Sequence, residues 1–522
     1  MISPRLRRLT AGVGLAGAAA WYASHDVDSS WARTSRTLCY GALTALDYKC
    51  SAAAAAAAAD ARAAALAAAH ERAARRMLHV CTLHGGLYTK LGQFVASMTH
   101  VLPDQFTATL AACQDRARAV PFGAARAAVE AELGRPLEQM FDRFEPAPFA
   151  AASLAQVHRA VTSAGEEVVV KVQYPRLAEQ MAADQLALCV LSWMVERLFP
   201  GCGYQWLLPE FDESLRQELD FRQEAANASR AARLLVGLPD VYIPRTLPEL
   251  STGRVLTMER IEGVKLSDRE ALDRMRLSRP EIAYLLTAAF SVMIFQGGFV
   301  HCDPHPGNLL ARPHPSAKQR GTRPRVQLVL LDHGLYRELT SEFRHGYCEL
   351  WYSLITREHT RGRAAALALG VAPSDYDYLS LLLTFRPASS RTALGSRLGK
   401  EERTRLRERL GQLSFADISS FFERMPRDML FVMRTWAYVR SLNRDLGGTT
   451  RSRLALQAEY AARGVSEASR TLQEGWVATL VDELYACFHI CRVRLYICLF
   501  DAVFRLHAVM RKITPHSTRD LG

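Results

Sequence analysis

The chain has 522 residues, 49% of them hydrophobic, and its formal net charge at pH 7 is +12. This length and apolar content allow a large buried core and predict about two to four domains. The positive charge is spread along the chain and favours an anionic partner, such as a nucleotide or an acidic lipid, without selecting one. No pattern of aromatic and basic residues typical of RNA binding is present, and the 11 cysteines include no C-x-x-C pair. The sequence therefore predicts neither a nucleic-acid partner nor a zinc site.

The first 25 residues have the composition of a targeting or anchoring segment. Residues 1–25 contain arginine but no acidic residue, and their apolar stretch at 9–23 is 15 residues long. A helix of that length measures roughly 22 Å, which is short of the roughly 30 Å hydrocarbon core of a bilayer. A mitochondrial presequence, a secretory signal and an interfacial membrane anchor all remain open.

The region that follows is rich in alanine. Residues 26–78 include eight consecutive alanines and further alanine-rich turns. This composition has high helix propensity and carries no chemistry of its own, which indicates a helical linker.

A predicted β-hairpin contains the first candidate site residue. Two apolar runs, at 154–161 and 166–172, flank the turn residues 162–165. The second run places Lys171 among β-branched residues, the arrangement in which an ammonium reaches from a sheet to nucleotide phosphates. Only seven of the 65 basic residues are lysines, so the choice of a compact ammonium here indicates a specific role.

The counter-ion of Lys171 is expected on a helix predicted over residues 209–235. That segment carries Glu218, Asp220 and Glu224. At about 100° per residue, Asp220 and Glu224 share one face, whereas Glu218 lies about 200° from Asp220. One face of a continuous helix cannot present all three carboxylates, and we expect Glu224 to pair with Lys171. The alternative is a solvated face on which the carboxylates pair with arginines of the same helix.

Two segments further along the chain have the composition of a phosphoryl-transfer centre. The sequence H-C-D-P-H-P-G-N occupies 301–308, and D-H-G at 332–334 follows an apolar run that predicts a buried strand. In this spacing Asp303 can act as a proton acceptor, while Asn308 and Asp332 offer the oxygen ligands that Mg²⁺ prefers. Either segment alone is common in loops, and their combination makes the prediction specific.

The C-terminal region is expected to be helical. Residues 472–512 mix large apolar residues with frequent charges, which excludes a simple transmembrane helix. A helix packed into the core and an amphipathic helix on a membrane surface remain open.

Together these residues resemble one family, the UbiB/AarF-domain atypical kinase-like proteins, also called the activity-of-bc-one family. The resemblance covers roughly residues 80–450 and rests on sequences that follow one another in order: YTKLGQ, LPDQF, AAASLAQVHRA, VVVKVQYP, ELDFRQEA, HCDPHPGNLL and LLDHGLY. Within the family, DHGLY, PRDMLFVMRT and NRDLG are similar to the mitochondrial aarF domain-containing kinase 1 type.

The resemblance implies an α+β, bilobal protein-kinase-like fold with a small β-sheet N-lobe, a helical C-lobe and family-specific helical extensions. The expected order is a targeting or anchor segment at 1–25, the linker at 26–78, a helical extension with the K-x-G-Q sequence at 79–145, the N-lobe at 146–263, the C-lobe at 264–450 and a helical tail at 451–522.

The resemblance also implies roles for the candidate residues. Lys171 would contact nucleotide phosphates with Glu224 as its partner, and Asp303 would be the catalytic-loop carboxylate. Asn308 and Asp332 would bind the metal.

A second lysine is implied to act beside the first. Lys90 and Gln93 of the K-x-G-Q sequence would fold over the active site, where Lys90 would meet Glu218 and Asp220 of the E-x-D sequence. Two carboxylate faces would then serve two different lysines.

The glycine-rich flap of protein kinases is replaced here by Ala150, Ala151, Ala152 and Ser153, which would bind the nucleotide. Each alanine adds a Cβ and narrows the allowed dihedral angles, so we expect this flap to approach phosphates less closely. The alternative is that these alanines begin a helix.

We therefore expect a Mg-ATP-binding atypical kinase-like protein, an ATPase or a phosphotransferase, acting in mitochondrial lipid or membrane homeostasis. Protein phosphorylation is disfavoured because no A-P-E segment follows the D-H-G sequence. The alternatives are a nucleotide-gated scaffold with little turnover and an atypical protein serine/threonine kinase. Aminoglycoside- and choline-type phosphotransferases share the H-x-D-x-H-P-G-N loop but lack the K-x-G-Q and E-x-D sequences.

The expected cofactors are ATP and Mg²⁺, and the expected location is mitochondrial, associated with the inner membrane. An anionic or prenyl-type lipid and the membrane surface are candidate partners. The sequence names no protein partner.

Overall fold

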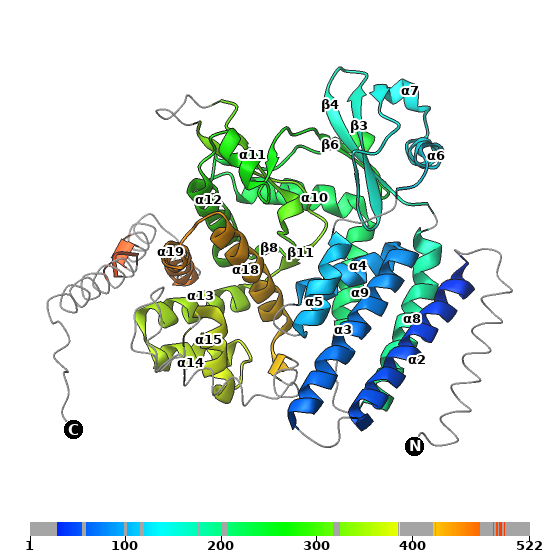
Figure 1. The fold of residues 1–522 in the computed structure, drawn as a ribbon. Coiled ribbons are helices and arrows are strands. Elements are labelled where there is room, and N and C mark those ends of the chain that lie inside the picture. The colour runs from blue at the N-terminus through cyan, green and yellow to red at the C-terminus, as the bar shows by residue number, and fades with distance from the viewer. Residues whose placement is uncertain are drawn as a thin grey trace, which may run out of the picture. The chain divides into compact units, whose positions relative to one another are not determined.

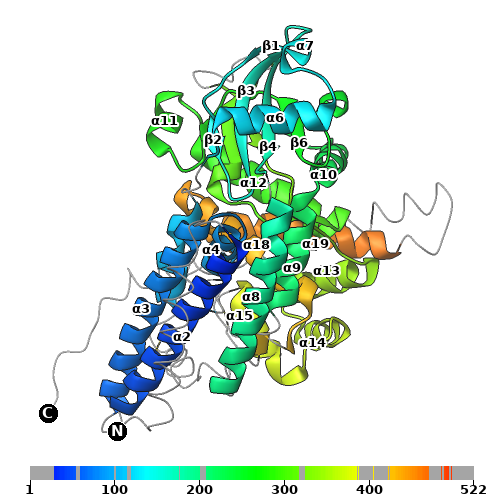
Figure 2. The ribbon, with the colours of Figure 1, turned by 90° about the vertical axis from the view of Figure 1, so that its right-hand side faces the viewer.

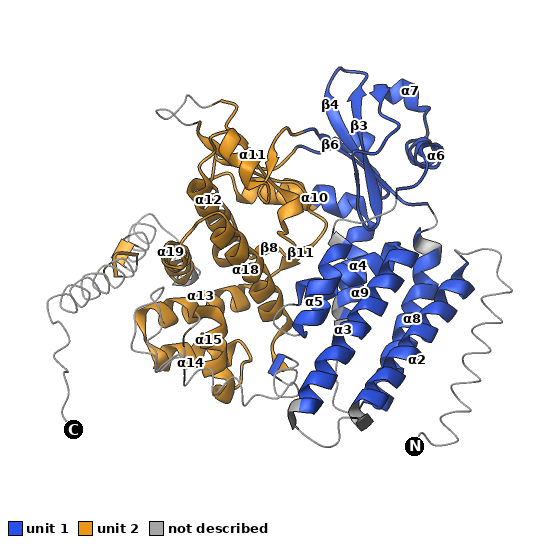
Figure 3. Ribbon diagram, viewed as in Figure 1, with its two compact units in different colours: residues 1–226, 245–260, 415–423 blue, residues 227–244, 261–414, 424–522 orange. Residues whose placement is uncertain are grey.

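The computed structural model describes residues 29–54, 59–98, 102–114, 119–175, 177–199, 207–316, 324–384 and 421–469, apart from residue 423, and isolated positions outside these ranges. The predictions for residues 1–25 and for most of 472–512 lie outside the described residues. The chain divides into two compact units, coloured separately in Figure 3. Unit 1 comprises residues 1–226, 245–260 and 415–423, and unit 2 comprises residues 227–244, 261–414 and 424–522.

Helices form one part of unit 1. They are α2 (Ser30–Ala54), α3 (Ala59–His84), α4 (Gly86–Ser97), α5 (Asp104–Leu110), α8 (Leu177–Leu198) and α9 (Leu207–Leu219), with a short 3₁₀ turn at Ala111–Gln114. Helix α2 lies beside α3 and α8, as Figures 1 and 2 both show. The described alanine-rich residues of the predicted linker, at 51–54 and 59–78, are helical, and Ala69, Ala73 and Ala74 are buried.

A buried ion pair fixes α2 against α8. Arg33 Nη2 lies 2.5 Å from Asp184 Oδ2, and the two side chains are 2% and 1% exposed. Arg33 Nη1 also donates to the carbonyl oxygen of His84 at the end of α3. Breaking a buried pair of this kind costs about 3–5 kcal/mol. One arginine therefore holds α2, α3 and α8 together. Its contact with α3 lies directly before α4, the helix that carries the K-x-G-Q sequence.

A five-stranded antiparallel sheet forms the other part of unit 1. Its strands are β1 (Phe141–Phe144), β2 (Ala150–Ala151), β3 (Ala155–Thr162), β4 (Glu167–Gln173) and β6 (Val255–Glu259), in the order β1-β3-β4-β6 with β2 paired to β3. The shorter helical segments of this part are α6 (Phe122–Leu133), α7 (Leu137–Met140) and Pro248–Leu250. Val168, Val170 and Val172 of β4 are at most 1% exposed and belong to a core cluster with residues of α6. Because side chains alternate along a strand, Lys171 lies on the opposite face of the sheet.

The helix predicted over 209–235 is two helices in the structure. Helix α10 spans Phe221–Leu234, and Asp220 separates it from α9. The Asp220 carboxylate accepts a hydrogen bond from the backbone N–H of Arg222, and the N–H of Phe221 donates to the carbonyl oxygen of Gly253. These bonds satisfy backbone donors that a helix N-terminus leaves free. The chain therefore starts a new helix at this point, with a new direction for its side chains.

Unit 2 is mainly helical, with two small sheets. One sheet has the order β5 (Val241–Tyr242), β10 (Val326–Leu330), β9 (Leu309–Pro313) and β7 (Val264–Lys265), and the other pairs β8 (Phe299–His301) with β11 (Tyr336–Glu338). The helices are α11 (Arg269–Arg274), α12 (Arg279–Ser291), α13 (Ser341–Thr356), α14 (His359–Ala368), α15 (Tyr376–Thr384), α18 (Arg427–Asp445) and α19 (Thr450–Ser469). A π-helical segment at Val292–Gly297 continues α12, and 3₁₀ turns lie at Pro306–Asn308 and Pro373–Asp375. Helices joined to small, mostly antiparallel sheets confirm the predicted α+β class.

The core of unit 2 is aromatic. Phe295 packs against Tyr347 and Trp351 of α13 and Trp436 of α18, with ring centroids 5.7, 6.2 and 6.0 Å away. Within the described residues, the segment Arg279–Gly297 is long and apolar enough to cross a membrane, but 67% of it is buried. Since this segment packs against α18 and α19, it has the surroundings of a core helix.

Candidate active site

In unit 1, Lys171 and Glu224 form the predicted ion pair. Lys171 Nζ donates to both carboxylate oxygens of Glu224, each at 2.9 Å. The two side chains are 14% and 3% exposed, and the ammonium also lies 5.1 Å from the centroid of the Phe221 ring. Glu224 is in the first turn of α10 and Lys171 is on β4. The pair thus joins the sheet to a helix, with the ammonium held on the side of the sheet that α10 covers.

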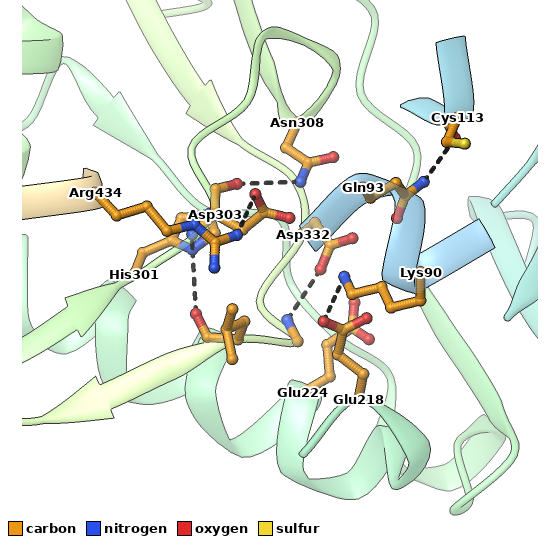
Figure 4. A network of polar contacts seen from close by, with 12 residues as sticks. Lys90, Gln93, Cys113, Glu218, Glu224, His301, Asp303, Asn308, Asp332 and Arg434 are labelled. Carbon is orange, nitrogen blue, oxygen red and sulfur yellow. Dashed lines mark hydrogen bonds and ion pairs between the residues drawn. The ribbon is translucent and has the colours of Figure 1, made fainter. Parts of the chain in front are cut away.

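The second predicted pair also lies within unit 1. Lys90 Nζ on α4 is 2.5 Å from Glu218 Oε1 on α9, and the two side chains are 11% and 15% exposed. Figure 4 shows this pair with Gln93, whose side-chain amide donates to the carbonyl oxygen of Cys113. Asp220, the other acid of the E-x-D sequence, is exposed and caps α10. The break between α9 and α10 lets Glu218 meet one lysine and Glu224 the other.

The glycine of the K-x-G-Q sequence is required by a close approach of α4 to the turn that follows α5. A Cβ atom at Gly92 would lie 2.5 Å from Cys113 Sγ and 3.3 Å from Cys81 Sγ. Since Cβ atoms do not approach other heavy atoms this closely, any larger residue would push α4 away from Cys113. The hydrogen bond from the Gln93 side chain to the carbonyl oxygen of Cys113 also holds α4 against this turn. Gly92 and Gln93 together therefore fix the position of Lys90.

The alanine segment forms a strand and a turn, which excludes a helix start. Ala150 and Ala151 are β2 and pair with Val157 and Gln156 of β3. The N–H of Ala152 donates to the carbonyl oxygen of Ala155, which closes the turn around Ser153. The segment therefore has the hairpin form of a flap, with alanine side chains where protein kinases have glycine.

In unit 2, Asp303 follows β8. The register of β8 with β11 pairs His301 with Tyr336, and the N–H of Cys302 donates to the carbonyl oxygen of Leu335. This pairing ends at Cys302, so the carboxylate of Asp303 stands at the first position beyond the strand. It is partly buried, with a side chain that is 19% exposed.

The loop after Asp303 has a fixed shape. The N–H of His305 donates to the carbonyl oxygen of Asp303, and the N–H of Asn308 donates to that of His305. The imidazole Nδ1 of His305 accepts a bond from the N–H of Gly307. A Cβ atom at Gly307 would lie 2.6 Å from His305 Cε1, so only glycine allows this imidazole to lie against the backbone.

Asn308 and Asp332 are brought together by the β9–β10 hairpin. Leu309 pairs with Leu330 at the end of that ladder, and the N–H of Leu331 donates to the carbonyl oxygen of Asn308. Asn308 thus immediately precedes β9 and Asp332 lies just beyond β10, at the same end of two paired strands. Figure 4 shows both side chains with Asp303, whose carbonyl oxygen accepts from the Asn308 amide.

The chemistry of these donors fits a magnesium ion that is held partly by its substrate. Among the residues that the structure describes, no group of three His, Cys, Asp or Glu residues could hold a metal alone. Mg²⁺ commonly takes only one or two protein ligands and completes its octahedron with water and substrate phosphates. The amide oxygen of Asn308 and the carboxylate of Asp332 are ligands of that type.

Buried imidazoles support the two loops of this site. His301 is 1% exposed and stacks on Tyr336, with ring centroids 5.1 Å apart. His333 Nε2 lies 3.1 Å from the carbonyl oxygen of Leu330 and must donate to it, so Nδ1 accepts from the hydroxyl of Tyr336 at 2.9 Å. The side-chain amide of Asn227 donates to the carbonyl oxygen of His333. Sequence reasoning missed Asn227, which has no distinctive neighbours.

Three buried histidines, His301, His158 and His84, should make the protein less stable in mild acid. Burial lowers the pKa of His301, His158 and His84, and that of His84 falls to about 3. Unfolded histidines take up protons near pH 6.5 while the folded ones do not, so stability is full above that pH and lost below it, by about 1.4 kcal/mol per pH unit per proton. The melting temperature of His301→Gln should fall less between pH 7.5 and 5.5 than that of the wild type, or of the exposed His79→Gln control. Equal slopes for all three proteins would contradict this.

A further residue at the site is Arg434 of α18. Its Nη2 atom lies 3.6 Å from Asp303 Oδ1, and its side chain is 10% exposed. The sequence PRDMLFVMRT, which contains Arg434, contributes to the family resemblance. Nothing in its local pattern predicts a contact with the loop at 301–308.

The segment after the D-H-G sequence is short. From Gly334 the chain forms β11 and then enters α13 at Ser341. Arg337 and Glu338 belong to β11 and pair with Val300 and Phe299. The described chain therefore has no extended loop here of the kind that forms a docking platform in protein kinases.

Comparison with known proteins agrees with this fold. A model of the ABC1 atypical kinase-like domain matches residues 112–365. AarF domain-containing protein kinase 1 of Xenopus laevis is 37% identical over 380 residues, which is 72% of this chain and 72% of that protein. The mouse protein of the same name is 34% identical over 417 residues, covering 80% and 78% of the two chains. The probable serine/threonine-protein kinase abkD of Dictyostelium discoideum is 38% identical over 405 residues, covering 77% and 56%.

Among solved structures, the complex of Rv3197 with erythromycin from Mycobacterium tuberculosis is similar at a TM-score of 0.47 and 22% identity, covering 74% of this chain and 96% of that one. The fold and the site residues define a kinase-like protein. The chain belongs to the ABC1/AarF family of atypical kinase-like proteins, and curated relatives over most of its length are named AarF domain-containing protein kinase 1. The resemblance inferred from the sequence is confirmed.

Proposed function

We propose that this protein binds Mg-ATP and either hydrolyses it or transfers its γ-phosphoryl group. Lys171, held by Glu224, contacts the phosphates, and Asn308 and Asp332 bind the magnesium ion. Asp303 orients the attacking hydroxyl or water and accepts its proton. The observation that carries the proposal is the Lys171–Glu224 pair, since it fixes an ammonium on β4, the arrangement that contacts nucleotide phosphates in kinase-like enzymes.

The short segment after Gly334 favours hydrolysis or a small acceptor over a protein substrate. A protein acceptor needs a surface that holds a peptide in line with the γ-phosphate. The names of relatives that call them protein kinases apply to those proteins. An aminoglycoside- or choline-type enzyme is disfavoured because Lys90 is paired with Glu218.

The purified full chain tests the proposal. ATP binding should be measured by calorimetry with and without Mg²⁺, and phosphate release should be followed with water as the only acceptor and with added small alcohols. Mg²⁺-dependent binding with release supports catalysis. Binding without release under every condition supports a nucleotide-gated scaffold, and absence of binding rejects both.

The scaffold is the second candidate function because of the flap. Ala150, Ala151 and Ala152 each carry a Cβ atom at the hairpin that approaches phosphates in protein kinases. A flap that stands further from the phosphates binds nucleotide but stabilises a transition state less well.

The Lys90–Glu218 pair is proposed to restrain the site. Lys90→Ala should raise phosphate release about fivefold or more, because α4 loses the ion pair that holds it against α9 and the resting arrangement is destabilised. Glu218→Gln should have the same effect, while Lys265→Ala, at an exposed lysine of β7, should have none. Phosphate release would be followed by a coupled assay at saturating ATP. A fall in both variants, or no change, would reject a restraining role.

We further propose a mitochondrial location, associated with the inner membrane, and a role in mitochondrial lipid homeostasis. The arginine-containing, acid-free composition of residues 1–25 supports the location. Fractionation of cells that express the full chain with a C-terminal tag tests it: recovery of the protein outside mitochondria would reject the proposal. Flotation with vesicles containing anionic lipid tests the membrane partner.

A further inference from the structure

An arginine from a distant helix lies beside the carboxylate that follows β8. Arg434 Nη2 is 3.6 Å from Asp303 Oδ1, and Figure 4 shows the guanidinium directed at that carboxylate. The two side chains are only 10% and 19% exposed. Charges that are partly withdrawn from water interact more strongly than the same charges on a surface, so this contact acts on Asp303 more than an exposed pair would.

Arg434 lies on a helix that is joined to the strand beside the catalytic loop. Arg337 of β11 donates to Asp428 of α18 at 2.7 Å, which fixes the start of α18 to the strand beside β8. Thr435, the neighbour of Arg434, is fully buried and lies within hydrogen-bonding reach of the Cys302 thiol. Helix α18 is therefore joined to β11 beside the catalytic loop, and it places the guanidinium next to that loop.

We propose that Arg434 is a positioning residue for Asp303. It lies against one carboxylate oxygen and fixes the orientation of the group toward the nucleophile, so that Asp303 can accept the proton of the attacking hydroxyl or water. This inference rests on the proposed function, in which Asp303 has that task. Arg434 contacts the carboxylate and not the nucleotide in this account, so its loss acts on the rate and leaves ATP affinity unchanged.

The kinetic test compares two arginines that join α18 to the same part of unit 2. Arg434→Met should lower kcat for phosphate release about ten- to a hundredfold, the cost of misplacing a catalytic group, with KM for ATP within twofold of wild type. Arg434→Lys should recover part of the rate, because an ammonium can still bind the carboxylate. Arg337→Met removes the ion pair with Asp428 at the start of α18 and should lower the melting temperature with kcat within twofold of wild type.

In the Asp303→Asn background, Arg434→Met should cause no further loss of rate. Equal losses of kcat in Arg434→Met and Arg337→Met would assign Arg434 a packing role and overturn the inference. A rise in KM for ATP with unchanged kcat would also overturn it, since Arg434 would then bind nucleotide directly.

A measurement without turnover separates this inference from the proposed function. Melting temperatures are compared for the wild type, Asp303→Asn, Arg434→Met and the double variant. Coupling of the two residues predicts that Asp303→Asn lowers the melting temperature, because it leaves the guanidinium without its carboxylate, and that adding Arg434→Met recovers part of the loss. Additive shifts overturn the pairing. If the wild type releases no phosphate but the shifts are coupled, catalysis is rejected and the pairing stands.

Discussion

Replacing Asp332 with asparagine should reduce Mg²⁺-dependent phosphate release at least a hundredfold. The metal ion contributes several kcal/mol of transition-state charge stabilisation, and each factor of ten in rate corresponds to about 1.4 kcal/mol. Asparagine retains an oxygen that can accept from the N–H of Gly334, the bond that Asp332 Oδ1 makes now. The loop should therefore keep its shape, and the loss should report on the metal. The rate would be measured as a function of Mg²⁺ concentration at fixed ATP.

The matched control is Asp445→Asn, which removes a half-exposed carboxylate that pairs with Arg269 at the end of α18. It should leave the rate and the Mg²⁺ dependence unchanged. If Asp332→Asn releases phosphate at the wild-type rate with the same Mg²⁺ dependence, Asp332 is not a metal ligand.

Removing Lys171 should cost both binding and stability. Lys171→Met is expected to weaken ATP binding at least about tenfold. Because Glu224 is 3% exposed, the variant leaves a buried carboxylate without its counter-ion, and the free energy of unfolding should fall by about 3–5 kcal/mol. Glu224→Gln should also weaken ATP binding, since the ammonium is then no longer held in place. Calorimetry gives the affinity and denaturant unfolding gives the stability.

The double variant distinguishes the two effects. Lys171→Met with Glu224→Gln removes both charges, so most of the lost stability should return while ATP binding stays weak. Lys265→Met serves as the control for loss of one lysine at an exposed position. Wild-type affinity in Lys171→Met would show that the ammonium does not meet the nucleotide.

The sequence was sufficient for those parts of the site that depend on local pattern. The β-branched run around Lys171 and the turn residues 162–165 predicted the β3–β4 hairpin, because alternation and turn composition are local properties. The apolar run before Asp332 likewise predicted β10, and its register with β9 is what brings Asn308 to the same end.

The break at Asp220 could not be predicted in the same way. Residues 210–235 contain neither glycine nor proline. The helical pattern of the sequence therefore continues through Asp220. The break is stabilised by the bond from Phe221 to Gly253, which is far along the chain. For the same reason the role of Gly92 appears only once Cys81 and Cys113 are seen beside it. Tertiary contacts decide both features, and they leave no local signature.

The central proposal is that binding of Mg-ATP requires both Lys171 of unit 1 and the proposed metal ligands Asn308 and Asp332 of unit 2. A double-mutant cycle of ATP affinity at saturating Mg²⁺ tests it, with wild type, Lys171→Met, Asp332→Asn and the double variant. Groups that act on the same phosphates should be coupled by about 0.5–3 kcal/mol. The claim predicts that each single change weakens binding and that their effects are not additive. Additive effects, or wild-type affinity in either single variant, would contradict it.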